Sequence, residues 1–323
     1  MYDVIIIGGG PAGLTAALYN ARARLKVLVL EKTKLGGQIV STHEIANFPG
    51  SVKGAAAETS GPELIARMTE QAEKFGAQIK VGQAVEQLEL TGTVKKVTCQ
   101  DGTTYESYAI ICANGAHPRA IGCPGERELA GKGVSYCATC DGAFFEDLEV
   151  FVIGGGNSAV EEAMFITSFA RKVTLIQNLS DLTADAIAIE QARANDKIEY
   201  IFNSVVEKIE GAGMVEAMTI RNTETGITTR FEATEEDGLF GIFVFIGNVP
   251  NTKIYEGLIP LDTAGYMLTD DTLQTQVAGV FAAGDLRPKV LRQVITAAGD
   301  GATAAFSAQN YVKRIKQQGG VLT

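Results

Sequence analysis

Two cysteines three positions apart, Cys137 and Cys140, are followed at once by an acid, Asp141. A pair with this spacing can bind a metal, staple the fold or exchange electrons. Tetrahedral zinc requires about four ligands, and the chain offers only two histidines, His43 and His117, and no second Cys-x-x-Cys pair. We therefore interpret the two cysteines as a redox pair and predict no metal site.

The overall composition indicates a soluble α/β protein of about two domains. The chain has 323 residues, 46% of them hydrophobic and 20% charged, and it is rich in glycine. Its net charge of −10 argues against nucleic-acid binding, which requires a basic surface. We find no run of roughly 18 apolar residues and no leader of the export type. Five cysteines in so long a chain favour a reducing cytoplasm.

A glycine-rich turn near the N-terminus has the features of a dinucleotide site. Residues 2–7 are an apolar, β-branched run that predicts a strand, and residues 14–23 have a helical composition. A G-x-G-x-x-G pattern between them permits a tight turn, close approach of a pyrophosphate and close helix–strand packing. Its members are Gly8, Gly10 and Gly13. The next predicted strand, 26–30, is followed by Glu31, the acid expected about 20 residues on to bind a ribose diol.

The same order of strand, glycine turn and helix occurs a second time. Residues 148–153 and 172–176 predict buried strands, and residues 160–169 predict the helix between them. The second turn is formed by Gly154, Gly156 and Ala159. The chain is therefore expected to contain two nucleotide-type folds.

A third feature near the C-terminus determines how the two folds share the chain. Residues 277–285 predict a buried strand that ends in Gly284 and Asp285, and an Ala-rich helix follows over about 293–315. Such a strand offers a carboxylate and a helix dipole to a ligand of the first fold. We therefore predict an α/β protein with two Rossmann-like domains. Residues 1–114 and 247–323 form the first, and residues 115–246 are inserted into it.

Seven motifs, in the same order and over nearly the full length, resemble those of the low-molecular-weight thioredoxin reductases. They are Gly8-x-Gly10-x-x-Gly13, Gly36-Gly37-Gln38, Asn47-Phe48-Pro49-Gly50, Cys137-Ala138-Thr139-Cys140-Asp141, Gly154-x-Gly156-x-x-Ala159, Gly247-x-x-Pro250-Asn251 and Gly284-Asp285. The resemblance implies a homodimer that binds FAD in the first domain, carries a redox-active disulfide in the second and reduces thioredoxin.

The resemblance also implies a role for individual residues. Cys140 is expected to face the flavin, Cys137 to attack the disulfide of thioredoxin, and Asp141 to handle protons beside them. Thiol–disulfide exchange requires an accessible thiolate and a proton donor for the leaving sulfur, which these residue types supply. The implied FAD contacts are Gly8, Gly10, Pro11, Ala12, Gly13, Glu31, Lys32, Gly37, Gln38, Asn47, Gly284, Asp285, Arg292, Gln293 and Val294.

The stretch after the second glycine turn departs from the NADPH-using members of that family. Those members have His-Arg-Arg there and a further Arg four residues later, and these cations bind the 2′-phosphate. The matching residues are Gln177, Asn178, Leu179 and Thr183, and residues 173–192 contain no Lys, Arg or His. Each missing charge-assisted contact removes about 1.5–3 kcal/mol. We therefore predict that NADPH is a very poor electron donor.

The electron donor is therefore predicted to be a reduced carrier other than NADPH. The sub-group that the chain most resembles, the ferredoxin-dependent flavin thioredoxin reductases, makes reduced ferredoxin our first choice. NADH, for which an acid would be expected near Gln177 and Asn178, is an alternative. So are a deazaflavin or a second flavin in the second cleft, and a redox sensor that does not turn over.

A ferredoxin would require a local basic patch, because ferredoxins are usually acidic and this chain carries −10. From residue 287 to the C-terminus there are six basic residues and one acid, Asp300. We predict a docking face formed by Arg287, Lys289, Arg292, Lys313, Arg314 and Lys316.

Overall fold

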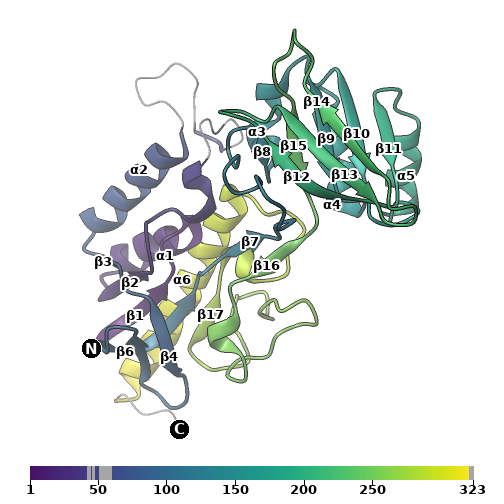
Figure 1. Cartoon of the computed structure of the whole chain (residues 1–323). Coiled ribbons are helices and arrows are strands. Elements are labelled where there is room, and N and C mark those ends of the chain that lie inside the picture. The colour runs from purple at the N-terminus through teal and green to yellow at the C-terminus, as the bar shows by residue number, and fades with distance from the viewer. Residues whose placement is uncertain (42–44, 46–47, 51–59, 320–323) are drawn as a thin grey trace. The chain divides into compact units, whose positions relative to one another are not determined.

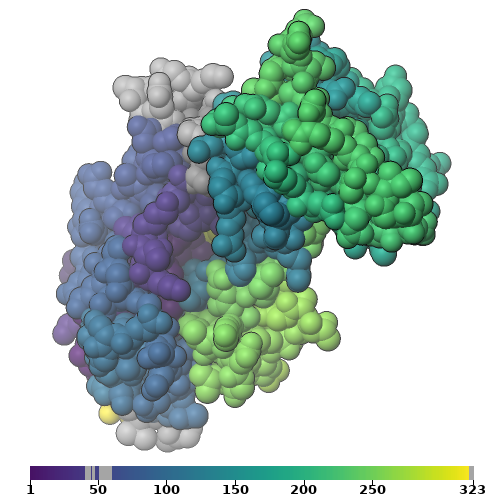
Figure 2. Space-filling view, viewed as in Figure 1, coloured from purple at the N-terminus to yellow at the C-terminus, as the bar shows by residue number. Residues whose placement is uncertain are grey.

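A computed structural model describes residues 1–41, 45, 48–50 and 60–319 of the chain (Figure 1). The chain divides into two compact units, Met1–His117 with Val249–Thr323, and Pro118–Asn248. The first unit thus combines the two ends of the chain, and in Figure 2 it contains both the purple and blue N-terminal residues and the yellow-green C-terminal ones. The second unit is continuous in sequence and is coloured from teal to green.

The first unit is built on a seven-stranded sheet in the order β3-β2-β1-β6-β5-β4, with β17 also paired to β6. The pairs of β1 with β2 and β6, of β2 with β3 and of β17 with β6 are parallel, whereas β4 and β5 are antiparallel additions. The strands are β1 (Tyr2–Ile7), β2 (Val27–Glu31), β3 (Gln78–Val81), β4 (Val85–Glu89), β5 (Lys95–Cys99), β6 (Thr104–Cys112) and β17 (Val280–Ala282).

Successive side chains of a strand point to opposite faces of the sheet, so each face of this sheet has its own buried core. Helices α1 and α6 cover one of these faces. Val4 and Ile6 of β1 share a buried core with α1 and α6, while Ile5 and Ile7 point into a core on the other face. The helical elements of this unit are α1 (Pro11–Arg22), η1 (Gly37–Ser41), α2 (Gly61–Lys74), η3 (Lys253–Tyr255), η4 (Gly284–Leu286) and α6 (Val294–Gln317).

The second unit repeats this plan with a five-stranded parallel sheet in the order β11-β10-β9-β15-β8. A three-stranded antiparallel sheet, β12-β13-β14, adds to it. The strands are β8 (Val134–Ser135), β9 (Glu149–Ile153), β10 (Lys172–Ile176), β11 (Ile198–Ile201), β12 (Ser204–Glu210), β13 (Ala217–Asn222), β14 (Thr228–Glu232) and β15 (Gly241–Val244). The helical elements are α3 (Ala138–Asp141), η2 (Gly142–Phe145), α4 (Asn157–Ile166) and α5 (Ala186–Arg193).

The segments at which the chain passes between the units form a two-stranded sheet. They are β7 (Ala116–Pro118) and β16 (Asn248–Pro250). In the part of the chain that the structure describes, no helix is long and apolar enough to cross a membrane.

The predicted α/β fold with two Rossmann-like sheets is confirmed, and several element boundaries differ from the sequence-based expectation, three of them by three residues or more. α1 begins at Pro11 rather than Leu14, since proline is well tolerated in the first helical turn. α4 begins at Asn157, directly after its glycine turn. The predicted strand over 277–285 is confined to Val280–Ala282, because Gly284 adopts a positive φ of 76° and starts the 3-10 turn η4.

Candidate functional site

The two cysteines of the Cys-x-x-Cys pair form a disulfide at the start of helix α3. Cys137 is the N-cap residue of α3, and the Cα atoms of Cys137 and Cys140 are 5.3 Å apart. The N–H groups of Cys140 and Asp141 both donate to the Cys137 carbonyl, at 3.3 and 3.1 Å. The Thr139 hydroxyl lies 3.4 Å from Cys137 Sγ. Both cysteines therefore lie in one helical turn, and the turn brings their sulfur atoms within bonding distance.

Asp141 is held beside the disulfide by a serine that the sequence analysis did not identify. Ser135 ends strand β8, and its hydroxyl donates to Asp141 Oδ2 at 2.6 Å. The same hydroxyl oxygen accepts the Cys137 N–H at 3.1 Å. Ser135 is buried and Asp141 is half-buried, so this bridge is partly shielded from water. A serine two residues before a cysteine carries no recognisable signal, because only the return of α3 over the end of β8 brings it to Asp141.

A buried acid, Glu126, fixes the residue that precedes Cys137. Its carboxylate accepts the Tyr136 hydroxyl at 2.8 Å and the N–H groups of Ile121 and Gly122 at 2.8 and 2.7 Å. Burial and this hydrogen bond raise the pKa of Tyr136 above its ordinary value. Tyr136 therefore remains a neutral donor, and it anchors one side of the disulfide turn.

The first glycine turn requires glycine at Gly8 and Gly13 for packing reasons. Gly8 has a φ of 111°, and an added Cβ would lie 2.3 Å from the Ala113 carbonyl oxygen. A Cβ on Gly13 would lie 1.9 Å from the Gly8 carbonyl oxygen. Gly10 differs, since a Cβ there would meet only the Gly36 oxygen, at 3.9 Å. Gly10 is the N-cap of α1, so the open space lies at a helix N-terminus, where a phosphate is favoured.

The predicted ribose acid, Glu31, lies at the end of β2 and reaches this turn. Its Oε2 accepts the Gly9 N–H at 2.8 Å, and its Oε1 accepts the Thr33 N–H at 3.0 Å. Lys32 beside it is exposed. The predicted contacts Pro11 and Ala12 open α1, so they lie next to Glu31's partner Gly9 in the same turn.

The predicted contacts in the next loop are described only in part. Gly37 and Gln38 begin η1, and an added Cβ on Gly37 would lie 4.0 Å from Gly10. The Gln38 side-chain amide donates to the Ala116 carbonyl. Asn47 lies outside the described residues.

The C-terminal group of predicted contacts packs directly on the first turn. A Cβ on Gly284 would lie 3.0 Å from the Ala12 Cβ, which places η4 against the start of α1. Gln293 is the N-cap of α6, where its N–H donates to the Thr296 hydroxyl at 3.2 Å, and Val294 is the first, buried residue of that helix. The fold therefore gathers residues separated by some 270 positions around one set of helix N-termini.

Two buried polar atoms of this cluster are available to a ligand. Among the described residues, Asp285 Oδ1 and Arg292 Nε have no hydrogen-bond partner. Burial raises the pKa of Asp285, and the nearby cations Lys289 and Arg292 oppose this effect. The Arg292 guanidinium lies 4.9 Å from the Tyr266 ring centroid. One buried acceptor and one buried donor left unsatisfied would destabilise the fold unless a polar ligand pairs with them.

The second glycine turn has the same order of strand, turn and helix, but a different side chain packs over it. Gln177 follows β10 as Glu31 ends β2, and it is only 5% exposed. An added Cβ on Gly155 would lie 2.3 Å from Gln177 Nε2, so the amide packs over the turn. Gln177 Oε1 accepts the Asn178 N–H at 3.0 Å. Thr183, whose N–H donates to the Gly155 carbonyl at 2.7 Å, completes the lining.

Comparison with known proteins gives a consistent family. Residues 2–301 match the family described as pyridine nucleotide-disulphide oxidoreductase. The chain is 54% identical over 313 residues to a thioredoxin reductase of Peptoclostridium acidaminophilum, covering 97% of this chain and 98% of that protein. It is 43% identical over 318 residues to the thioredoxin reductase of Bacillus subtilis, covering 98% and 96%.

A solved structure agrees with the sequence matches. The thioredoxin reductase of Streptococcus pyogenes superimposes with a TM-score of 0.85 at 42% identity, covering 97% of this chain and 99% of that one. This chain belongs to the thioredoxin reductase family. Members of the family are FAD-dependent flavoproteins, and FAD is the cofactor. The open N-terminus of α1 and the unpaired atoms of Asp285 and Arg292 fit such a group.

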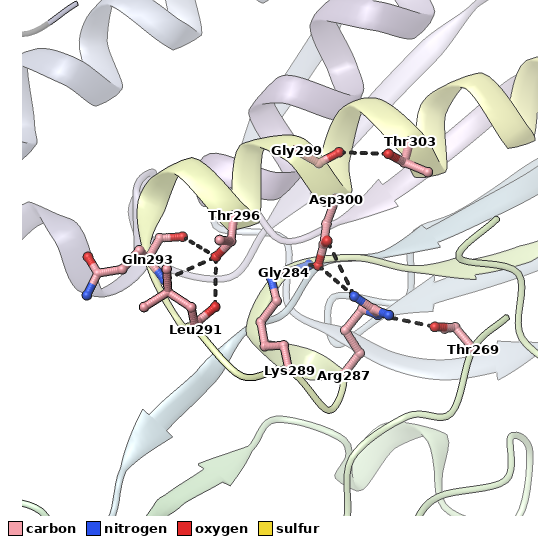
Figure 3. Close-up of polar contacts among 10 residues, drawn as sticks. All are labelled: Thr269, Gly284, Arg287, Lys289, Leu291, Gln293, Thr296, Gly299, Asp300 and Thr303. Carbon is pink, nitrogen blue, oxygen red and sulfur yellow. Dashed lines mark hydrogen bonds and ion pairs between the residues drawn. The ribbon is translucent and has the colours of Figure 1, made fainter. Parts of the chain in front are cut away.

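The six basic residues from which the sequence predicted a docking face do not form one continuous surface. Arg287 and Lys289 both pair with Asp300, and the Lys289 side chain is only 8% exposed (Figure 3). Lys313, Arg314 and Lys316 are exposed at the other end of the 24-residue helix α6. At about 1.5 Å per residue, these three residues lie about 20–24 Å along the helix from Asp300, which binds Gly284 of η4.

Proposed function

We propose that the protein reduces the disulfide of thioredoxin through Cys137 and Cys140, with FAD as the internal carrier and reduced ferredoxin as the electron donor. Bound FAD supplies a group that accepts electrons from a donor and delivers a pair of them to a disulfide. The observation that carries the disulfide chemistry is the closed Cys137–Cys140 pair with Asp141 held beside it by Ser135.

In the reduced enzyme, Cys137 attacks one sulfur of the thioredoxin disulfide as a thiolate. A mixed disulfide forms, and the leaving thioredoxin sulfur takes a proton. Cys140 then attacks Cys137 Sγ, which releases the second thioredoxin thiol and restores the Cys137–Cys140 disulfide. Two electrons and two protons leave the enzyme in each cycle. Asp141 is placed to hold and pass a proton, and the Ser135 hydroxyl orients its carboxylate.

The first unit is proposed to bind FAD through the residues gathered around the N-termini of α1 and α6. The glycines of the first turn would let a pyrophosphate approach the backbone at Gly10, and Glu31, which accepts the Gly9 N–H, would bind the ribose. Asp285 and Arg292 provide an acceptor and a donor for the flavin end. The second unit is proposed to serve as a nucleotide-type frame that carries the disulfide.

Rejection of NADPH rests on the lining of the second turn. Residues 173–192 carry no cation, and the next one, Arg193, pairs with Asp181 at 2.7 Å. Gln177 occupies the position of the ribose acid and uses its oxygen on Asn178 N–H. Loss of three or four charge-assisted contacts at about 1.5–3 kcal/mol each lowers NADPH affinity by several decades.

The donor is tested by anaerobic mixing of the FAD-loaded protein with reduced ferredoxin, NADH and NADPH in turn, followed by flavin absorbance. We expect ferredoxin to bleach the flavin and oxidised thioredoxin to restore its absorbance. Rapid bleaching by micromolar NADPH would overturn the donor assignment, and bleaching by NADH alone would replace ferredoxin with NADH. Steady thioredoxin reduction with any donor excludes a redox sensor that does not turn over.

A Cys137→Ser variant separates the two halves of the cycle. It keeps the flavin site intact, so ferredoxin is expected to bleach the flavin as in the wild type, while thioredoxin reduction is lost. Persistence of thioredoxin reduction in this variant would refute the assigned role of the disulfide. We further propose that the enzyme acts in the cytoplasm as a homodimer, which sedimentation of the FAD-loaded protein tests.

A further inference from the structure

Asp300 lies in the second turn of α6 and binds the segment that joins β17 to that helix. Its Oδ2 accepts the Gly284 N–H at 3.0 Å and the Lys289 ammonium at 2.8 Å. The Arg287 guanidinium lies 3.4 Å from both carboxylate oxygens and also donates to the Thr269 hydroxyl at 3.1 Å (Figure 3). One acid thus connects a backbone amide and two cations from a short stretch of chain.

These contacts are shielded from solvent, which makes them stronger than surface ion pairs. The side chain of Asp300 is 15% exposed, that of Lys289 8% and that of Arg287 21%. Surface pairs contribute about 0–1 kcal/mol, whereas removal of one partner of a buried pair leaves an uncompensated charge. The cluster therefore holds the β17–α6 segment in one conformation.

The amide that Asp300 fixes belongs to the residue before Asp285. Gly284 has a φ of 76°, and an added Cβ would lie 3.0 Å from the Ala12 Cβ. A Cβ on Gly301 would lie 2.2 Å from the Ala12 carbonyl oxygen, so α6 packs even more closely on α1. Asp300, next to Gly301, therefore connects α6 and α1 with η4, the turn that contains Asp285.

Asp300 also binds the Lys289 ammonium, which lies near Asp285 as well. Lys289 and Arg292 are the cations that favour the ionised form of Asp285, while Asp300 disfavours it. Lys289 is bound to Asp300, and Asp285 Oδ1 has no partner among the described residues. Without the Asp300 charge, the ammonium would be left in a largely buried place with Asp285 as the nearby acid. That pair would occupy the oxygen that a ligand needs.

We propose that Asp300 is a positioning residue of the flavin site. It fixes the Gly284 amide, so that Asp285 is held in place, and it retains Lys289, so that the Asp285 carboxylate remains available. The inference rests on the assignment of Asp285 to the flavin in the proposed function.

The test compares FAD affinity among substitutions in the FAD-loaded, full-length protein. Asp300→Asn keeps an oxygen for the Gly284 N–H but removes the charge that retains Lys289. We expect this variant to release FAD with a dissociation constant raised by about tenfold, measured from the flavin fluorescence that appears on serial dilution. The double variant Asp300→Asn/Lys289→Met has no ammonium to divert and is expected to recover most of the affinity. Asp271→Asn, which changes an exposed acid of the same unit, is the matched control.

The outcomes distinguish a failure of the positioning role of Asp300 from a failure of the flavin site in the proposed function. An unchanged dissociation constant in Asp300→Asn, or a double variant as weak as the single one, would overturn the positioning role. An unchanged constant in Asp285→Asn would instead overturn the flavin site of the proposed function. Should Asp300→Asn fail to fold, Asp300→Asn/Lys289→Met, which keeps an oxygen for the Gly284 N–H, is compared with Asp300→Ala/Lys289→Met, which lacks it. A higher dissociation constant in the Ala variant supports the proposal, and equal constants overturn it.

Discussion

The two glycine turns of this molecule share a backbone plan and differ in the residue at the end of the strand that follows the turn and its helix, β2 in the first unit and β10 in the second. In the first unit, Glu31 presents a carboxylate to the Gly9 N–H. In the second, the neutral amide of Gln177 packs over Gly155 and bonds to the Asn178 N–H. Strand, turn and helix thus occur in both units, whereas an acid at the end of the second strand of the motif occurs in only one.

The difference teaches that glycine spacing specifies a shape rather than a ligand. Gly8 and Gly154 both have positive φ angles, 111° and 134°, and both lie against a carbonyl oxygen of a neighbouring strand end. These requirements are met equally whether or not a nucleotide binds. Selection between nucleotides comes from side chains outside the pattern, and these side chains are free to change while the fold is conserved.

The largest expected effect concerns what the second unit contributes to turnover. If its contribution is the disulfide rather than the glycine turn, Cys137→Ser and Cys140→Ser should each lower thioredoxin reduction by about 10³-fold or more, because exchange requires both sulfurs. The FAD content, read from absorbance, should not change. Cys123→Ser, at a half-buried free thiol of the same unit, is the control and should retain activity. Activity within tenfold of wild type in either variant would refute the assignment.

A second experiment tests whether the two turns tolerate a methyl group differently. Gly13→Ala would place a Cβ 1.9 Å from the Gly8 oxygen, so we expect a loss of about 2–3 kcal/mol in the free energy of unfolding. The corresponding residue of the second turn is already Ala159, and Ala159→Gly should cost only about 1 kcal/mol. Urea unfolding measures both. Gly299→Ala, in open space on α6, is the control and should be neutral or stabilising, so equal losses at Gly13 and Gly299 would contradict the packing argument.

A third experiment converts the second turn toward phosphate binding. The triple variant Asn178→Arg, Leu179→Arg, Thr183→Arg places cations at three exposed positions of the missing clamp. We expect flavin bleaching by NADPH to improve by about 10–100-fold, since each new charge-assisted contact contributes about 1.5–3 kcal/mol at best. The same positions changed to Gln add bulk without charge. No difference between the Arg and Gln triples would show that the missing clamp is not what excludes NADPH.

The smallest effect concerns the buried acid of the first unit. Burial raises the pKa of Asp285, so the folded state holds its proton more tightly than the unfolded chain does. In protein prepared without FAD, the stability that Asp285 contributes should therefore be lost as the pH rises above 3.8, the ordinary pKa of an aspartate. Asp285→Asn should remove that slope. Urea midpoints measured across this range check it, and parallel curves for the two proteins would count against the buried carboxyl.

The repeated strand–turn–helix order was predictable because it depends on local sequence. Strands β1 and β10 were predicted with the bounds that the structure gives, since each is a short apolar run between clear turn signals. The helix starts at Pro11 and Asn157 were placed too late, because glycine and proline within a turn obscure a helix N-terminus. The antiparallel strands β12, β13 and β14 depend on long-range pairing and were not predicted.

The sequence alone determined the residue types on which chemistry depends. These are two cysteines one helical turn apart, an acid after one glycine turn and an amide after the other. Only the tertiary structure decided which side chains those groups meet. It placed Ser135 on Asp141, and it buried Lys289 against Asp300, which removed two cations from the predicted docking face. The physical reason is that backbone geometry follows from neighbours in the chain, whereas burial and charge pairing are set by residues distant in sequence.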